Sequence, residues 1–375
     1  MAGIYIHIPF CRQACYYCDF HFSVNQDVKP QLIKAIAKEL TLQKDYLQGE
    51  AIDTIYLGGG TPSLLTAVEL SLLFGTIRSH YSVSPHAEIT LEANPDDLTR
   101  EKLSQLKSIG LNRLSIGIQT FNTERLKSLN RIHDEASAIR SFNDAREAGF
   151  DNITIDLMYA LPGETMDDWR RDIAQAINLH PEHISCYSLT IEPKTVFGKW
   201  AATGKLNLQS DEVAARHLEM LMEMLPAAGY EHYEISNFAK PGFHSKHNSS
   251  YWRGVNYLGV GPSAHSFNGE SRQYNITNNH LYLKALNSDA IPFEKEILSR
   301  ENRINEYILT SLRTSWGTDL SFLKQTYGYD LLTENKNYLS ELLEKQFVTF
   351  DDGVLKLTKA GKLFADKISS DLFLT

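Results

Sequence analysis

Short β-rich runs alternate with longer amphipathic runs through the first half of this 375-residue chain. Six runs rich in β-branched and aliphatic residues predict strands over residues 4–8, 54–57, 88–93, 113–118, 153–158 and 183–189. The stretches between them have helical periodicity, over residues 31–47, 67–80, 100–108, 135–148 and 166–179. Strands that alternate with helices pair in parallel through right-handed crossovers. We therefore expect the first half to form an α/β fold.

Polar and glycine residues gather near the C-terminal ends of these predicted strands. They are Cys11, the run 58–61, Glu92, Gln119 and Asp156. In a β/α barrel, that end of the strands carries the chemistry. Periodicity alone does not separate a closed barrel from an open sheet. We interpret the pattern as a partial six-unit (β/α) barrel that side chains alone do not seal.

The pattern changes after about residue 210, and we expect three parts. These are a partial barrel over 1–210, a connecting region over 211–299 that starts with a helix over 211–225, and a C-terminal domain over 300–375. The last part has helical runs over 304–313, 320–326 and 332–346, two strands over 348–350 and 354–357, and a final helix. This order resembles a winged-helix module. Residues 301–375 hold nine Lys plus Arg and eleven Asp plus Glu, so we expect a packing or partner surface instead of DNA binding.

Cysteine content and charge narrow the class of protein. Four cysteines are too few for a disulfide framework, and three of them fall within eight residues, as in metal or cluster sites. Residues 1–10 do not read as a signal peptide, and no apolar run approaches the ~18 residues of a membrane span. We therefore expect a cytoplasmic protein. A net charge of −9 argues against a general nucleic-acid binder.

Cys11, Cys15 and Cys18 directly follow the first predicted strand. Zinc is one interpretation, with His21 as the fourth ligand, although structural zinc sites usually pair two chelating loops. A [4Fe–4S] cluster normally takes four thiolates, so three leave one iron open to another ligand. We favour the cluster and keep zinc as its rival.

Two further signals lie downstream. The run Gly58-Gly59-Gly60-Thr61-Pro62 lets the backbone approach a ligand closely, but it lacks the lysine of a phosphate-binding loop. The second signal is a set of polar residues in apolar surroundings, namely Glu92, Gln119, Arg131 and Asp156. Buried carboxylates need partners, so Arg131 with Asp156 forms either an internal ion pair or part of a ligand site.

Together these motifs resemble the radical SAM superfamily. The resemblance rests on Cys-x3-Cys-x2-Cys, with Tyr17 just before the last cysteine, and on Gly-Gly-Gly-Thr-Pro. Four more stretches extend it over nearly the whole chain: YIHIPFC at 5–11, LEANP at 91–95, RLSIGIQ at 113–119 and LPGET at 161–165. They are similar to the branch that contains oxygen-independent coproporphyrinogen III dehydrogenase and the HemW haem chaperones.

The resemblance implies a cofactor set. Cys11, Cys15 and Cys18 would ligate a [4Fe–4S] cluster. S-adenosylmethionine would be surrounded by Tyr5, Tyr17, Gly59, Gly60, Thr61, Glu92, Gln119, Arg131 and Asp156. The backbone of residues 59–61 would meet its amino group, and the polar set would hold its carboxylate and ribose. In this family the cofactors carry the radical chemistry, and the protein orients them.

Two departures favour the haem chaperones over the dehydrogenase. Phe20 replaces a further cysteine, and only ten residues precede Cys11 where the dehydrogenase has an N-terminal extension. In addition, His247-Asn248-Ser249-Ser250-Tyr251-Trp252 matches the H-N-x-x-Y-W motif associated with haem binding in the HemW group. We expect His247 to lie in an exposed polar loop, where its imidazole is a candidate axial ligand of haem.

The resemblance therefore implies a chaperone that binds haem and delivers it to an acceptor protein. We also expect a peripheral membrane contact and, from the net charge, no nucleic-acid partner. The alternative is an enzyme, an oxygen-independent coproporphyrinogen III dehydrogenase or another radical enzyme acting on tetrapyrroles. We do not expect the dehydrogenase activity and assign no catalytic residue. A third hypothesis is a zinc-stabilised β/α scaffold with a partner-binding C-terminal module.

Overall fold

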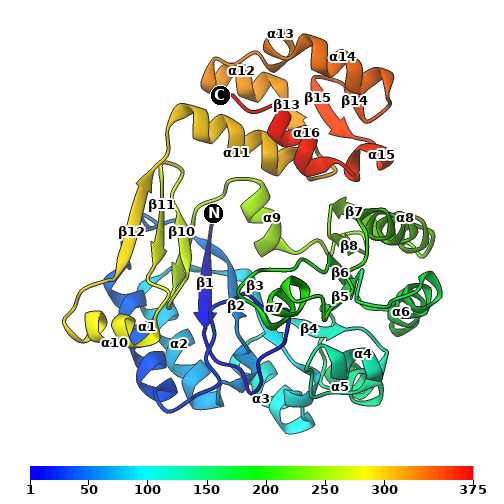
Figure 1. Cartoon of the computed structure of the whole chain (residues 1–375). Coiled ribbons are helices and arrows are strands. Elements are labelled where there is room, and N and C mark those ends of the chain that lie inside the picture. The colour runs from blue at the N-terminus through cyan, green and yellow to red at the C-terminus, as the bar shows by residue number, and fades with distance from the viewer. Residues whose placement is uncertain (375) are drawn as a thin grey trace.

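The computed structural model describes residues 1–374 of the chain. Its centre is a 12-stranded sheet in which six consecutive strands pair in parallel, in chain order. They are β1 (Ala2–Ile8), β2 (Ile52–Gly59), β3 (Val83–Ala93), β4 (Arg113–Gln119), β5 (Ile153–Tyr159) and β6 (His183–Ser188). The outer sides of β1 and β6 pair with β9 (Tyr257–Val260) and β8 (Asn237–Ala239), so the six strands stay open (Figure 1). The prediction of an α/β fold with a partial six-unit barrel is confirmed.

The crossover helices begin where their capping residues place them. Helices α2 (Ala67–His80), α5 (Glu135–Glu147) and α6 (Met166–Leu179) each begin behind a capping box, which satisfies free N–H groups of the first turn. Helix α1 (Lys29–Leu42) ends five residues before its predicted end, in turns that lead to Gln48 and Gly49 at positive φ. The remaining helical segments are η1 (Pro62–Leu64), η2 (Pro95–Asp97), α3 (Arg100–Ile109), α4 (Thr123–Ser128) and α7 (Val196–Ala202).

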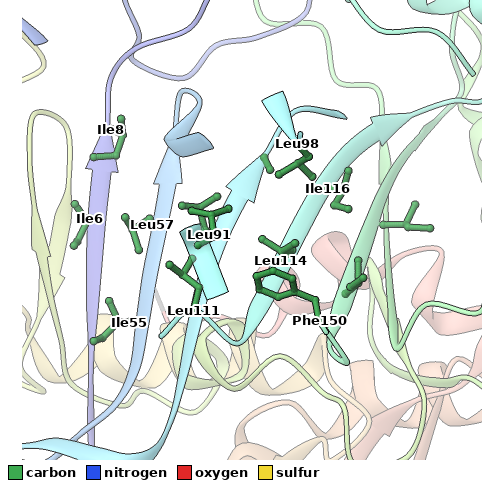
Figure 2. Close-up of a cluster of buried hydrophobic side chains, with 14 of the residues drawn as sticks. Ile6, Ile8, Ile55, Leu57, Leu91, Leu98, Leu111, Leu114, Ile116 and Phe150 are labelled. Atoms are coloured by element: carbon green, nitrogen blue, oxygen red, sulfur yellow. The ribbon is translucent and has the colours of Figure 1, made fainter. Parts of the chain in front are cut away.

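The main core lies between the parallel strands and these helices. Figure 2 shows Ile6, Leu57, Leu91 and Leu114 on four neighbouring strands, and all four side chains are completely buried. Burying one such side chain contributes about 1.5–3 kcal/mol to folding. Nearly continuous apolar strands are typical of a parallel sheet that is covered on its faces.

The region expected to be a connection extends the sheet at both edges. At one edge, α8 (Asp211–Ala227) leads to β7 (Glu231–Glu234) and β8; β8 pairs antiparallel with β6, and β7 pairs antiparallel with the outer side of β8. At the other edge, β9 is followed by β10 (His265–Phe267), β11 (Ser271–Asn275) and β12 (Phe293–Ile297). Helices α9 (Lys246–Trp252) and α10 (Asn279–Asn287) complete this region. Sequence reasoning missed most of these strands because they are short and polar, and β12 is exposed along its whole length.

The C-terminal part has a core of its own. It contains α11 (Arg300–Leu312), β13 (Thr318–Asp319), α12 (Leu320–Tyr327), α13 (Leu331–Glu334), α14 (Lys336–Glu344), β14 (Val348–Asp351), β15 (Val354–Leu357), α15 (Lys359–Lys362) and α16 (Ala365–Asp371). The predicted helix over 332–346 is two helices, since the backbone leaves the helical conformation at Asn335. We call residues 300–374 the C-terminal module; Figure 1 shows it in orange and red beyond one end of the sheet.

The C-terminal module is joined to the sheet by backbone pairing. The Ser315 N–H donates to the Tyr233 carbonyl over 2.9 Å, and the Ile235 N–H donates to the Arg313 carbonyl over 3.1 Å. An isolated bridge pairs Glu234 with Thr314. Within residues 1–374, no helix combines the length and the apolar character that crossing a membrane requires.

Candidate functional site

A cavity of about 500 Å³ opens at the C-terminal ends of the parallel strands, and we call it the cluster cavity. Eleven of the thirteen predicted site residues line it: Cys11, Cys15, Tyr17, Cys18, Gly59, Gly60, Thr61, Glu92, Gln119, Arg131 and Asp156. These residues come from the loop after β1 and from the ends of β2 to β5, except Arg131, which lies between α4 and α5. The carboxyl ends of parallel strands share one edge of a sheet, so residues far apart in sequence meet there.

The three cysteines lie on the loop that follows β1. Two backbone hydrogen bonds hold the base of this loop, from Cys11 N–H to the Ser23 carbonyl (3.1 Å) and from Ser23 N–H to the Pro9 carbonyl (2.9 Å). Donors approach two of the sulfurs, since the Thr61 hydroxyl lies 3.3 Å from Cys11 Sγ and Arg131 Nη1 lies 3.6 Å from Cys15 Sγ. Burial raises the pKa of Cys11 to about 11 and that of Cys18 to about 12. Metal binding at these thiols therefore releases protons.

The donor set fits an iron–sulfur cluster. Within residues 1–374, no three His, Cys, Asp or Glu side chains are close enough to hold one metal ion. The thiolates of a cluster bind different irons, so they need not converge on one point. His21, the fourth ligand of the zinc interpretation, does not line the cluster cavity, and its Nε2 lies 2.8 Å from Asn279 Oδ1.

Residues 59–61 form the wall of the cluster cavity beside the cysteine loop. A Cβ atom on Gly59, whose φ is +104°, would lie 2.6 Å from the His7 ring, and one on Gly60 would lie 2.7 Å from the Ile8 carbonyl oxygen. Only glycine fits this close approach of two backbones. The Gly60 N–H donates to the Ile8 carbonyl of β1 over 2.9 Å, and the Thr61 N–H donates to the Phe10 carbonyl at the start of the cysteine loop over 2.8 Å. The glycine run thus holds the cysteine loop, and a ligand can meet only its remaining carbonyl groups.

Two carboxyl groups face the cluster cavity from β3 and β5, the strands on either side of β4. Glu92 accepts a hydrogen bond from the Tyr56 hydroxyl (2.8 Å) and one from the Gly59 N–H (3.2 Å). Asp156 accepts one from the Ser115 hydroxyl at 3.0 Å. Burial raises the pKa of Glu92 to about 7 and that of Asp156 to about 6. The neighbouring donors therefore offset only part of the cost of burying these two negative charges. Both carboxylates are suited to accept further hydrogen bonds from a ligand.

Arg131 and Asp156 do not form the internal ion pair that the sequence left open. Arg131 Nη2 donates to Asn94 Oδ1 over 2.9 Å and to the Gly117 carbonyl over 2.6 Å. Among the described residues, no salt bridge joins it to a carboxylate. Gln119 has a positive φ of 69° where the register between β4 and β5 shifts. Such strained backbone is concentrated at functional sites and re-aims a side chain.

His247 corrects one expectation. It lies on α9 and is buried, with 1% of its surface exposed, and not in an exposed loop. Its Nδ1 lies 2.8 Å from Thr54 Oγ1, its Nε2 lies 2.8 Å from the Tyr251 hydroxyl, and its ring stacks on Tyr56 at 4.9 Å. The polar sequence forms a helix because Ser245 caps it and Glu88 accepts from its first N–H groups. A role of His247 as a haem ligand requires the side-chain hydrogen bond at the coordinating ring nitrogen to break.

Tyr5 is the other predicted residue outside the cluster cavity. Its ring stacks on Tyr56 at 6.2 Å, and its hydroxyl lies 3.2 Å from His7 Nδ1. It lines a neighbouring cavity instead.

Sequence reasoning missed several residues that line the cluster cavity. On β4, Arg113, Ser115, Gly117 and Gln119 all line it, which is the period-two pattern of one strand face. Counting back in twos from the predicted Gln119 finds the other three. No such sequence pattern points to Tyr56 and Asn94. Only the structure identifies them, through the hydrogen bond that each forms with a predicted residue.

Two family models match the chain. One describes the radical SAM superfamily and matches residues 5–176, and the other describes the HemN C-terminal domain and matches residues 298–364. The first covers five of the six parallel strands, from β1 to β5, together with most of α6, and it includes the cysteine loop. The second covers most of the C-terminal module.

Named relatives match nearly the full length. The heme chaperone HemW of Bacillus subtilis is 38% identical over 98% of this chain and 98% of its own length. That of Lactococcus lactis is 36% identical over 95% and 93%. A solved structure, coproporphyrinogen III oxidase (HemN) from Escherichia coli, superposes with a TM-score of 0.86 at 26% identity, covering 99% of this chain and 90% of that one. The chain therefore belongs to the radical SAM superfamily and, within it, to the HemW family.

Proposed function

We propose that this chain is a haem chaperone that holds a [4Fe–4S] cluster on Cys11, Cys15 and Cys18 and binds S-adenosylmethionine beside it. The observation that carries the proposal is the convergence of three thiols, a glycine run and two raised-pKa carboxyls on one cavity. Relatives named as heme chaperones match the chain end to end. Haem and a haem-acceptor protein are the proposed partners, and a peripheral membrane contact stays a prediction.

Each wall of the cluster cavity has a part in this proposal. The cysteine loop supplies three thiolates, and the Gly60 carbonyl, which accepts no hydrogen bond from residues 1–374, is free to receive an amino group. Arg131 offers positive charge to a carboxylate, and Glu92 and Asp156 offer acceptors to ribose hydroxyls. When bound, the cluster and S-adenosylmethionine supply one-electron chemistry.

The cluster is tested by anaerobic reconstitution. Protein loaded with iron and sulfide should hold about four of each per chain. Replacing Cys11, Cys15 or Cys18 by Ser should abolish this, whereas Cys186→Ser, buried in β6, is the matched control that should retain it. Tetrahedral zinc without sulfide would instead support the zinc scaffold.

Binding of S-adenosylmethionine is tested on the reduced cluster. The ligand should change its electron paramagnetic resonance spectrum, because it coordinates the iron without a protein ligand. Asp156→Ala and Glu92→Ala should weaken this response at least about tenfold without loss of iron, since each removes an acceptor from the cluster cavity. A spectrum that saturating ligand leaves unchanged in the wild type contradicts the site.

Two assays separate the chaperone from the enzyme. Wild-type protein should bind haemin stoichiometrically in a titration followed by its visible absorbance. Given reductant and S-adenosylmethionine, it should not consume coproporphyrinogen III. Enzyme-like consumption favours the dehydrogenase, whose structural relative HemN shares the fold. Failure to bind haemin overturns the chaperone proposal and leaves the cofactor site unaffected.

A further inference from the structure

A second cavity, of about 730 Å³, adjoins the cluster cavity, and we call it the aromatic cavity. It lies between the β9–β11 edge of the sheet and helices α11 and α12 of the C-terminal module. Asp19 and Phe20 line both cavities, so the loop after Cys18 is their common wall. Phe20 is 71% exposed, which is unusual for a phenylalanine outside a binding surface. The volume is typical of a site for a large cofactor.

Aromatic rings form two opposed walls of this cavity. The sheet side contributes Trp252, Tyr257 and Phe267, and the C-terminal module contributes Tyr307, Phe322 and Tyr327. Neighbouring rings support one another, with Tyr257 and Phe267 centred 6.3 Å apart and Tyr307 and Phe322 centred 4.6 Å apart. Two facing aromatic walls suit a broad, flat, apolar molecule, because each face of such a molecule can stack on rings.

Among residues 1–374, His265 is the histidine of the aromatic cavity with no hydrogen bond to either ring nitrogen. Three histidines line it, but His7 lies 2.9 Å from the His21 carbonyl, and His21 lies 2.8 Å from Asn279. Neither ring nitrogen of His265 has a hydrogen-bond partner within residues 1–374, and the side chain is exposed. Burial of part of the ring, with the Arg272 charge, lowers the pKa of His265. The imidazole is therefore neutral at pH 7, the form that coordinates metals.

The turn that holds His265 is fixed by close packing. A Cβ atom on Gly259 would lie 2.0 Å from the His265 carbonyl oxygen, so β9 and β10 touch backbone to backbone. Between them, Ser263 has a φ of 66°, a conformation that L-residues rarely adopt. A strained backbone conformation persists only where the surrounding structure enforces it, and such conformations are concentrated at functional sites.

Three arginines complete the aromatic cavity. Arg253 lies 4.8 Å over the Trp316 ring, and Arg272 pairs with Glu306 at 2.8 Å. The buried Nε of Arg303 has no hydrogen-bond partner in the part of the chain that the structure describes. The carboxyl groups that line the same cavity are those of Asp19 and Glu306, so the three arginines outnumber them. A guanidinium with unused donors favours a ligand that carries carboxylates.

The position of α9 accounts for a link between the H-N-x-x-Y-W motif and haem even if His247 does not bind the iron. Tyr251 and Trp252 line the aromatic cavity, Asn248 lines the cluster cavity, and His247 holds the Tyr251 hydroxyl at 2.8 Å from beneath. His247 is thus a positioning residue, one step behind the surface.

We propose that haem binds in the aromatic cavity, with His265 as its axial ligand, its faces between the aromatic walls and its propionates toward Arg303 and Arg272. This inference rests on the proposed haem binding and gives it a site. A flat tetrapyrrole with two carboxylates and an iron that takes imidazole matches each feature of the cavity. The shared wall at Phe20 places bound haem next to the cluster cavity.

A ligand swap tests the axial bond. Haemin is titrated into the full-length protein and followed by its Soret band. His265→Ala should weaken binding at least about tenfold, as losses at metal sites commonly do. His265→Cys should bind with a shifted band, because thiolate and imidazole give haem different electronic properties. The exposed His280→Ala is the matched control and should titrate like the wild type.

The arginines have a separate test. Arg303→Ala should weaken haemin binding about tenfold but leave binding of haemin dimethyl ester, which lacks the carboxylates, unchanged. If His265→Ala and His265→Cys both titrate and absorb like the wild type, the proposed haem site is wrong, whereas the chaperone proposal stands. If wild-type protein binds no haemin, both fail. A spectrum that changes in His247→Gln but not in His265→Cys returns the ligand to α9.

Discussion

Glu39 is a fully buried carboxyl group that joins α1 to the edge of the sheet. Its oxygens accept hydrogen bonds from Asn275 Nδ2 (2.7 Å), the Gly261 N–H (2.8 Å) and Gln43 Nε2 (2.9 Å), and also from the Tyr282 hydroxyl. Burial raises the pKa of Glu39 despite these donors. One side chain thus satisfies donors from the C-terminal end of its own helix, from the turn after β9, from β11 and from α10, in the region that carries His265.

Replacing Glu39 by Ala should lower the free energy of unfolding by about 3–5 kcal/mol, because several buried donors lose their acceptor. Urea denaturation measures this. Lys34→Ala, an exposed position on the same helix, is the control and should change stability by no more than about 0.5 kcal/mol. Equal effects of the two substitutions contradict the hub role of Glu39.

At the scale of elements, two helical glycines have opposite environments. A Cβ atom on Gly75, inside α2, would meet nothing within 4 Å. One on Gly361, inside α15, would lie 1.8 Å from the Phe347 carbonyl oxygen, which Thr358 N–H already engages at 3.0 Å. Glycine weakens the first helix and is required by the second.

Gly75→Ala should therefore raise the free energy of unfolding by about 0.5–1 kcal/mol, through helix propensity and a less flexible unfolded chain. Gly361→Ala should lower it by about 1–3 kcal/mol, because the backbone of α15 must move from β14. Chemical denaturation of both variants checks the sign of each change. If both substitutions stabilise the protein, α15 can move away from the Phe347 carbonyl without a loss of stability.

At the scale of the whole molecule, a histidine–lysine contact ties the C-terminal module to the sheet. Lys362 Nζ, on α15, donates to His232 Nδ1 over 2.9 Å, and the opposite nitrogen of His232 lies 3.1 Å from the Ile235 carbonyl. Burial, with the Lys362 charge, lowers the pKa of His232 to about 3. The imidazole is therefore neutral, with its proton on Nε2.

Because the pKa of His232 is lower in the folded state than in the unfolded chain, its contribution to stability is present above about pH 6.5 and is lost as the pH falls toward 3. Between pH 7.5 and 5.0 the stability advantage of wild type over His232→Gln should shrink by up to about 2 kcal/mol. Glu234 faces Lys362 in the wild type and in His232→Gln alike, so its titration cancels when the stabilities of the two proteins are compared. His280→Gln, at an exposed position of α10, should show no such change. Urea midpoints at the two pH values decide it.

The sequence by itself determined the parallel half of the fold, because apolar strands and capped amphipathic helices are local patterns. Eleven residues that the family resemblance implied line the cluster cavity, and those at strand ends meet there because parallel strands bring their C-terminal ends to one edge. The three-part division at 210 and 300 stays a proposal, although residues 211–299 contribute strands to both edges of the sheet. Short polar strands such as β12 have no local signal, because pairing partners and not composition make them strands.

Only the tertiary structure decided the environment of each histidine. His247 stands in the more polar sequence, yet it is buried between Thr54 and Tyr251, whereas His265 is exposed on the wall of a cavity. The aromatic cavity itself arises where two separately folded cores meet, so its walls come from residues that nothing in the sequence connects. Periodicity reports which face of an element is buried, but not which distant element covers it.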